Sequence, residues 1–437
     1  MYNCAIMNIN KKEIRKFAVP LLVMGFFNYF AEQISITFAS RISLENLGSI
    51  VTVDNFLYSL VGMFGIFSVA FNIKASRAIG ADDEDGLNSY IKSIILLNLK
   101  IGIIFFIIVL FFSSIFLKLI YGFSGALLHT AALYLMINAL YMLIQMSLFA
   151  FANLMKVEQK TQYMMYVSVG IAIMHVILSY IIVKVLGFGI IGLGVINMIS
   201  LVVELLIYLV LTRKLVAKAF KAKANKQLEL IKYGIPMFGQ EFLEGVIFLI
   251  AVDAIVAHLG LGELAIYSVI FKILVFLKIS IYALGNTSTV FVGQALGEKN
   301  NIHVKQSVNY LLKVSYLIAA FLLAIIIIFN KYVTAFFTSD AKTIANVAGY
   351  LPVVVVAVVG IALYEQFKYV LQTLGAQSFV FMTTVIVNIA VVVLLFATTA
   401  LGWMSLFLLL ALYTLNFFVL GIIYFAKYRS IIAGNLL

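Results

Sequence analysis

A few acidic and basic residues interrupt the long apolar runs of this sequence, and these are the side chains that could do chemistry. Glu241 and Glu244 are three residues apart and would share one face of a helix. Two close carboxylates tend to share a proton, because a second negative charge is unfavourable beside the first. Lys278 lies at a similar depth in the next apolar run. If the apolar runs cross a membrane, these residues lie near its midplane. The pattern predicts a site there, with a Glu244–Lys278 ion pair, that binds and releases a proton or another cation.

Two further groups of charged residues fit the same scheme. Glu365, Lys368 and Gln372 are spaced i, i+3 and i+7, which predicts another polar helix face, and an internal Glu365–Lys368 pair is the simpler explanation. Asp253 and Lys272 lie nearer the opposite side and are expected to form a structural ion pair across neighbouring runs.

The first apolar run has a polar face of its own. In "FFNYFAEQIS" (26–35), Asn28, Glu32 and Ser35 recur at helical spacing. Such a face is unfavourable against lipid, so we expect it to line a central cavity. The carboxylate of Glu32 suits a proton, and together with the neutral oxygens of Asn28 and Ser35 it suits Na⁺.

The elements that hold these residues must be membrane helices. The 437-residue chain is 64% hydrophobic and only 11% charged, which is too little charge to cover a soluble surface. Twelve apolar runs, from 16–40 to 404–426, are each long enough to span a bilayer. They are continuously apolar, which argues against a transmembrane β-barrel. We expect an all-α integral membrane protein with twelve transmembrane helices.

The basic residues indicate topology. The net charge of +12 comes from connections between the apolar runs, so it does not predict a nucleic-acid partner. Lysine and arginine concentrate on the side of the N-terminal tail, which predicts cytoplasmic N- and C-termini in the inner or plasma membrane. We expect an N-terminal lobe at 1–211, a basic cytoplasmic linker at 212–228 and a C-terminal lobe at 229–437.

The two halves repeat one another. A shift of 217 residues places Gly80 on Gly297, each after the second apolar run of its half. We expect both glycines to turn the chain with a positive φ, and Arg77 and Gln294 to bond the freed carbonyls, so that the two stretches act as gating hinges. Six spans per repeat predict two lobes related by a pseudo-two-fold axis along the membrane normal, with alternating access between them.

Several of these stretches resemble a known family. "VGQALGEKN" (292–300) looks like the signature of the multidrug and toxic compound extrusion (MATE) transporters, and "SRAIGADDEDG" (76–86) resembles its first-half copy. "GFGIIGLGVINMIS" (187–200) and, more weakly, "LQTLGAQS" (371–378) are similar to other family stretches. In the family's pattern, a coupling-ion aspartate of the first span falls nearest Ser35, and acids of spans 7 and 10 correspond roughly to Glu244 and Glu365.

The resemblance implies a secondary transporter that exports organic compounds in exchange for H⁺ or Na⁺. Cationic, amphipathic compounds are the expected substrates. The wider superfamily also contains flippases for lipid-linked oligosaccharides. The alternative is therefore a flippase for an anionic lipid substrate, with phosphate contacts from four basic residues: Lys100, Lys272, Lys278 and Arg77.

Other classes find little support. No Gly-rich GK[ST] loop, HExxH motif or Cys/His cluster is present, and the single cysteine, Cys4, leaves no intramolecular disulfide. We expect a protein that is not an enzyme and uses no cofactor beyond the coupling ion. Its partners are expected to be a small-molecule substrate and the lipid bilayer, and it is expected to be a monomer.

Overall fold

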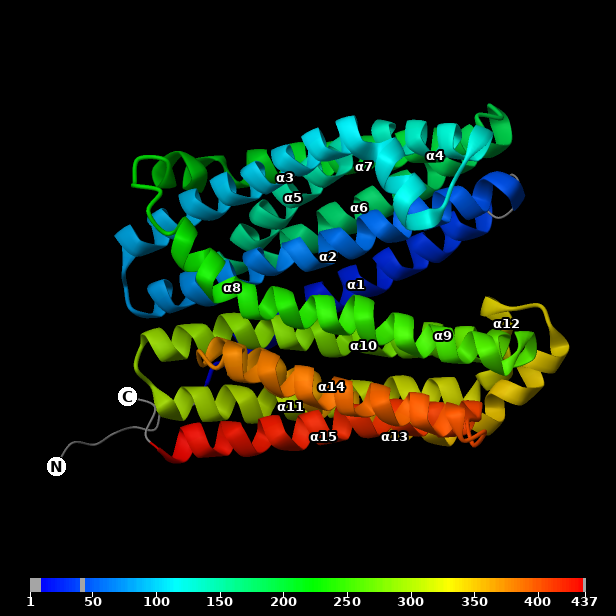
Figure 1. Ribbon diagram of the computed structural model, residues 1–437. Coiled ribbons are helices and arrows are strands. Elements are labelled where there is room, and N and C mark those ends of the chain that lie inside the picture. The colour runs from blue at the N-terminus through cyan, green and yellow to red at the C-terminus, as the bar shows by residue number, and fades with distance from the viewer. Residues whose placement is uncertain (1–8, 40–43, 435–437) are drawn as a thin grey trace. The chain divides into compact units, whose positions relative to one another are not determined.

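The computed structural model describes residues 9–39 and 44–434, and every regular element in these ranges is a helix (Figure 1). Eleven helices among the described residues are long and apolar enough to cross a membrane. A further helix of 37 residues, α2, is described only in part at the level of its side chains. The predicted all-α membrane fold is confirmed.

The helices of the two halves follow in chain order, and two short π-helices are labelled η. The described part of the first half forms α1 (Lys11–Ala39), α2 (Leu44–Gly80), α3 (Glu84–Tyr121), α4 (Gly125–Ile137), α5 (Ala139–Val157), α6 (Thr161–Tyr180), η1 (Ile181–Val185) and α7 (Gly189–Ala219). The second half forms α8 (Gln227–Phe242), η2 (Leu243–Phe248), α9 (Leu249–Leu259), α10 (Leu261–Gly297), α11 (Asn301–Ile328), α12 (Asn330–Phe337), α13 (Ala341–Thr373), α14 (Gln377–Ala400) and α15 (Leu406–Ala433).

The chain divides into two compact units. The N-terminal unit holds Val19–Ala78 and Asp83–Gly234, and the C-terminal unit holds the chain from Ile235 onwards together with Ile79–Asp82 and the described residues up to Ala18. The expected linker, 212–228, covers the last turns of α7, the connection to α8 and the first residues of α8.

The first helix of each half begins in the other half's unit. At the start of α1, Phe17 packs edge-on against Phe291 with ring centroids 5.5 Å apart, and the backbone N–H of Ile9 donates to Gln306. At the start of α8, Glu229 forms an ion pair with Lys74 at 2.9 Å and accepts a hydrogen bond from the Tyr90 hydroxyl at 2.8 Å. A proline follows each change of unit: α1 and α8 contain Pro20 and Pro236, respectively.

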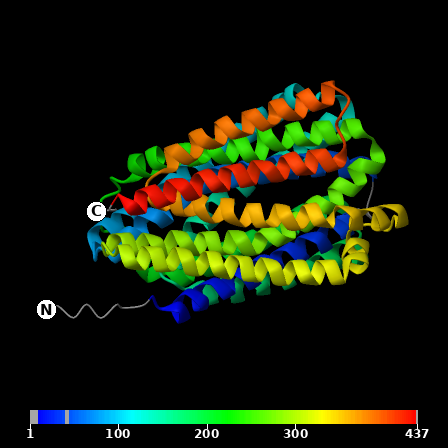
Figure 2. The ribbon, with the colours of Figure 1, turned by 90° about the horizontal axis from the view of Figure 1, so that it is seen from below.

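The C-terminal unit is built around α13. This helix packs between α10 and α15, and Figure 2 shows the three running alongside one another. Its buried residues include apolar ones such as Val354, Ile361 and Val370, but also Glu365 and Lys368. Charge within the central helix of an apolar core needs partners on the helices around it.

Amide side chains join three helices of the N-terminal unit. The side chain of Asn98 on α3 donates to the Ser68 hydroxyl on α2 and to the Met146 carbonyl on α5, both at 2.8 Å. The side chain of Asn72 donates to that of Asn153 at 2.6 Å. Interhelical hydrogen bonds of this kind hold membrane helices together where no hydrophobic driving force acts between them.

The repeated motifs are helix ends of matching geometry. Positive φ occurs at Asp82 (53°) and Lys299 (55°), again 217 residues apart. The side chains of the next residues, Asp83 and Asn300, then cap α3 and α11 by accepting backbone hydrogen bonds from Gly86 and His303.

The expectation of a positive φ at Gly80 and Gly297 is therefore wrong. Both are the last helical residues, of α2 and α10 respectively, and the left-handed position comes two residues later. Gly80 has a different constraint: a Cβ there would overlap the backbone carbonyl of Gln294. Gly80 is required by the close approach of two helix ends, and not by a turn.

Replacing Gly80 by Val is expected to destabilise the protein by about 1–3 kcal/mol, because the added atoms meet backbone and not a flexible side chain. The melting temperature of the purified protein in detergent measures the loss. Gly62 lies on the same helix, and a Cβ added there would meet no atom within 4 Å. Gly62→Ala is therefore the matched control and should not lower the melting temperature. Equal melting temperatures for Gly80→Val and the wild type would contradict this assignment.

Candidate functional site

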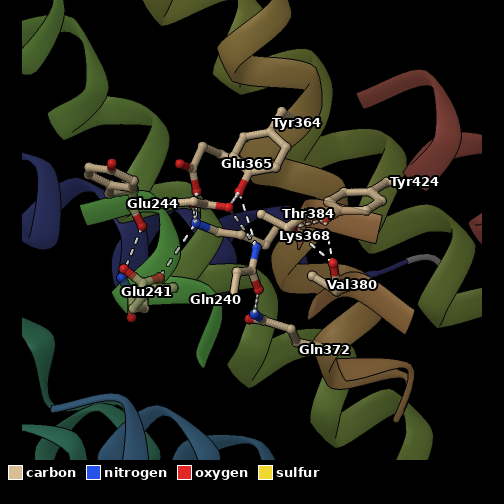
Figure 3. Close-up of polar contacts among 12 residues, drawn as sticks. Gln240, Glu241, Glu244, Tyr364, Glu365, Lys368, Gln372, Val380, Thr384 and Tyr424 are labelled. Atoms are coloured by element: carbon tan, nitrogen blue, oxygen red, sulfur yellow. Dashed lines mark hydrogen bonds and ion pairs between the residues drawn. The ribbon is translucent and has the colours of Figure 1, made fainter. Parts of the chain in front are cut away.

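Three carboxylates converge on one lysine inside the C-terminal unit (Figure 3). The Nζ atom of Lys368 lies 2.7 Å from a carboxylate oxygen of Glu365, 3.7 Å from one of Glu241 and 3.8 Å from one of Glu244. We call these four residues the Lys368 cluster. It unites Glu241, Glu244 and Glu365, which the sequence placed on two separate polar faces.

Helix geometry explains why these side chains meet. Glu365 and Lys368 are i and i+3 on α13, so they lie on one face of the helix. Glu241 is near the end of α8, and Glu244 is the second residue of η2. A π-helix is a local widening that often occurs at functional sites, because it re-aims the side chains that follow it. Glu241 and Glu244 both reach Lys368 across this junction.

Neutral donors surround Glu244. The Tyr364 hydroxyl on α13 donates a short hydrogen bond to Glu244, and the amide of Gln240 donates to the same oxygen at 3.1 Å. Gln240 in turn accepts a hydrogen bond from the Gln372 amide at 2.9 Å. These contacts link α8 and η2 to two turns of α13. They also provide the Glu244 carboxylate with hydrogen-bond donors from the protein.

A second tyrosine supports the first. The ring of Tyr424 on α15 stacks on that of Tyr364, with centroids 5.7 Å apart. The Tyr424 hydroxyl donates to the Val380 carbonyl at 2.9 Å and shares a hydrogen bond with the Thr384 hydroxyl at 2.6 Å. The orientation of Tyr364 is therefore fixed by packing against a helix that bears no charge at the site.

The Lys368 cluster is graded in burial. The side chains of Glu365 and Lys368 are each 3% exposed, that of Glu244 is 20% exposed and that of Glu241 is 33% exposed. Three carboxylates face one ammonium, so the cluster carries excess negative charge when all are ionised. Close carboxylates in a low-dielectric site cannot all remain ionised. The arrangement can therefore hold and release a proton or a cation, and Glu241 is the member nearest the surface.

The contacts of Lys278, Asp253 and Lys272 in the structure are with aromatic side chains. Lys278 Nζ donates to the Tyr413 hydroxyl at 3.4 Å and lies 5.1 Å from the centre of the Phe417 ring, whereas the cation beside Glu244 is Lys368. Asp253 accepts from the Tyr267 hydroxyl at 3.1 Å. Lys272 Nζ lies 5.8 Å from the centre of the Phe337 ring. The structural pair between Asp253 and Lys272 stays a prediction.

The polar face of α1 belongs to the N-terminal unit and is treated separately from the Lys368 cluster. Asn28 accepts a hydrogen bond from the Ser168 hydroxyl of α6 at 2.9 Å. Glu32 is exposed, and the side chain of Ser35 lies outside the described residues. Helical spacing keeps the three positions on one face of α1, and a sodium site there stays a prediction.

Sequence reasoning overlooked Gln240 and Tyr364. Gln240 precedes Glu241 and is four residues from Glu244, so a search for polar neighbours at helical spacing would have found it. Tyr364 gives no such signal, because tyrosine is common in membrane helices and only the fold brings its hydroxyl to Glu244.

Replacing Tyr364 by Phe should remove a hydrogen bond to a largely buried carboxylate, a change worth about 1.5–3 kcal/mol. The melting temperature in detergent should fall accordingly. The control is Tyr316→Phe, because the Tyr316 hydroxyl reaches only a backbone carbonyl, at 3.4 Å. A Tyr364→Phe protein no less stable than Tyr316→Phe would argue against a structural hydrogen bond to Glu244.

Comparisons with known proteins agree with this architecture. The MatE family model matches residues 20–181 and 236–399, one match in each half. The "Probable multidrug resistance protein YoeA" of Bacillus subtilis (strain 168) is 20% identical over 342 residues, which cover 75% of this chain and 73% of that protein.

Two solved structures share the fold along nearly the whole chain. One is described as the outward-facing conformation of a multidrug resistance MATE family transporter of the MOP superfamily, with a TM-score of 0.86 and 17% identity. The other is a MOP superfamily transporter from Pyrococcus furiosus whose binding pocket is described as having reverse polarity, with a TM-score of 0.86 and 18% identity. Each alignment covers 97% of this chain and 96% of the other. Since the family model matches both halves and most of the chain, this multi-pass membrane protein belongs to the MatE family of transporters.

Proposed function

We propose that this protein exports cationic, amphipathic organic compounds across the inner or plasma membrane, in exchange for a coupling cation. The two lobes, 1–211 and 229–437, would alternate between access to either side, with 212–228 as the connection between them. Both termini would lie in the cytoplasm, as the distribution of lysine and arginine indicates, and the working unit would be a monomer.

One observation carries this proposal: three carboxylates surround Lys368 within helices that span the membrane. A charge at mid-bilayer costs about 2.5–3.5 kcal/mol on insertion scales, so a cluster of four ionisable side chains needs a function that repays it. Excess negative charge in such a place attracts cations and binds protons. A cation exporter driven by an ion gradient uses both properties.

The family assignment supports the direction of transport. The Bacillus subtilis relative is named a probable multidrug resistance protein, and a structure with the same fold is named a multidrug resistance transporter. For this chain, the acidic Lys368 cluster favours a cationic substrate over the anionic lipid of the flippase alternative. Lys278, one of the lysines assigned to phosphate in that alternative, lies against the aromatic rings of Tyr413 and Phe417.

Transport of ethidium by the purified protein in proteoliposomes tests the proposal. An imposed gradient of H⁺ or Na⁺ should drive ethidium against its concentration gradient. If neither gradient moves ethidium, and a lipid-linked or other anionic lipid is moved instead, the flippase alternative replaces the exporter.

Glu244→Gln and Glu32→Gln should each slow ethidium transport, because each removes a carboxylate expected to bind cation or proton in its unit. Glu13→Gln is the control, since Glu13 is exposed in the first turn of α1 and has no role in the proposed sites. Initial rates normalised to the amount of reconstituted protein provide the comparison. The proposed roles are wrong if Glu244→Gln and Glu32→Gln both transport at the Glu13→Gln rate.

A further inference from the structure

The ammonium of Lys368 occupies the point where a bound cation would sit. It lies within 4 Å of oxygens from three different carboxylates, and its side chain is only 3% exposed. It also lies 5.2 Å and 5.4 Å from the ring centres of Tyr364 and Tyr369. Carboxylate oxygens combined with aromatic faces are a typical environment for an ammonium ion.

We propose that Lys368 is a tethered cation that permanently fills this site, so that the ion exchanged there is the proton, carried by Glu241, and not Na⁺. The inference rests on the proposed function, because it assumes that the Lys368 cluster couples an ion gradient to transport. It adds the identity of the coupling ion and the residue that carries it.

Ligand requirements separate the two ions. A hard metal cation needs several oxygen ligands at once, arranged around one point. In the Lys368 cluster the oxygens of Glu241, Glu244 and Glu365 already face a common point, and the ammonium is there. A sodium ion bound by the same oxygens would lie beside a second positive charge in a low-dielectric environment. A proton needs a single carboxylate oxygen and leaves the ammonium in place.

The hydrogen bonds identify Glu241 as the proton carrier. Glu244 accepts hydrogen bonds from Tyr364 and Gln240, and Glu365 has the closest contact with Lys368, so each of these two carboxylates already has close polar partners. Glu241 approaches Lys368 only to 3.7 Å, compared with 2.7 Å for Glu365, and it has the most exposed side chain of the three. It therefore offers a proton the best access to the cluster.

Charged and titratable groups face the cluster from each neighbouring helix. They are Glu241 and Glu244 from α8 and η2, Tyr364, Glu365 and Tyr369 from α13, Tyr282 and Lys278 from α10, and Tyr424 from α15. The tyrosines are neutral at physiological pH. The exchangeable proton of the site therefore belongs to one of the three carboxylates.

The exchange balances in charge. With Glu241 protonated, the Lys368 cluster holds two carboxylates and one ammonium. A monovalent organic cation that binds beside Glu241 displaces its proton to water, so one positive charge enters as one leaves. When the cation departs, a proton from water returns to the same oxygen. The net charge of the occupied site is the same in both forms, which avoids an additional buried charge at either stage.

Separate gradients test the inference on the wild-type protein. In proteoliposomes with the membrane potential clamped, a pH gradient should drive ethidium transport, and an equal Na⁺ gradient at constant pH should leave the rate unchanged. Transport driven by Na⁺ and not by pH would overturn the inference while leaving the exporter function intact. Transport driven by neither gradient would instead defeat the proposed function.

Variants then test the roles of the two residues. Lys368→Met removes the tethered cation, and ethidium transport or binding by this variant should become dependent on Na⁺. The matched control is Lys272→Met, which removes a half-buried lysine of α10 that lies against the Phe337 ring and not in the cluster, and which should not create Na⁺ dependence. Glu241→Gln should abolish the proton release that accompanies ethidium binding, measured with a pH indicator in weakly buffered detergent solution.

The outcomes separate clearly. Proton release by Glu241→Gln equal to that of the wild type would show that another group carries the proton and would overturn that assignment. Should Lys368→Met fail to fold, Lys368→Arg keeps a tethered cation and should retain the wild-type indifference to Na⁺. Sodium-dependent transport by Lys368→Arg and the wild type alike would contradict the tethered-cation role.

Discussion

The contact between Lys368 and its three carboxylates is the constraint on which the C-terminal unit depends. Two or more like charges cannot be buried in an apolar helix bundle without a counter-charge and hydrogen-bond donors. Lys368 provides the first, and Tyr364 and Gln240 provide the second. The requirement joins the α8–η2 junction to α13, the helix that bears the lysine and packs between α10 and α15.

Stability and function make opposite demands on this cluster. Removing one partner of a buried charge pair usually destabilises a protein strongly, whereas an apolar replacement of the whole group is often neutral. The cluster is thus a poor way to gain stability, and its retention is best understood through the chemistry it permits. Glu365 is buried and Glu241 is the more exposed, so a change of charge at Glu241 would act at the edge of the cluster and not at its centre.

Much of the fold could be predicted from sequence, because long apolar runs have few alternatives to membrane helices. The ends of the helices could not: α10 continues to Gly297, because the first six residues of the signature stretch, 292–297, are helical. For the site, helical spacing identified Glu241, Glu244 and Glu365 as candidates. Counting residues from the end of a span, however, gives only the depth of a side chain in the membrane. The neighbour of a side chain depends on the direction in which it points from the helix axis. The α8–η2 junction and the packing of α13 bring Lys368 to Glu244.

The start of α1 belongs to the C-terminal unit and the start of α8 to the N-terminal unit, which has a consequence for biogenesis. The first turns of α1 leave the ribosome early, yet their partners Phe291 and Gln306 are among the later residues to be synthesised. The N-terminal unit in turn lacks Glu229, the partner of Lys74 and Tyr90, until translation has passed the midpoint of the chain. The N-terminal unit is complete only after Gly234 has been made, and the C-terminal unit must wait for residues beyond Ile235 to pack against the start of α1. Insertion of the first spans therefore precedes the final assembly of either unit.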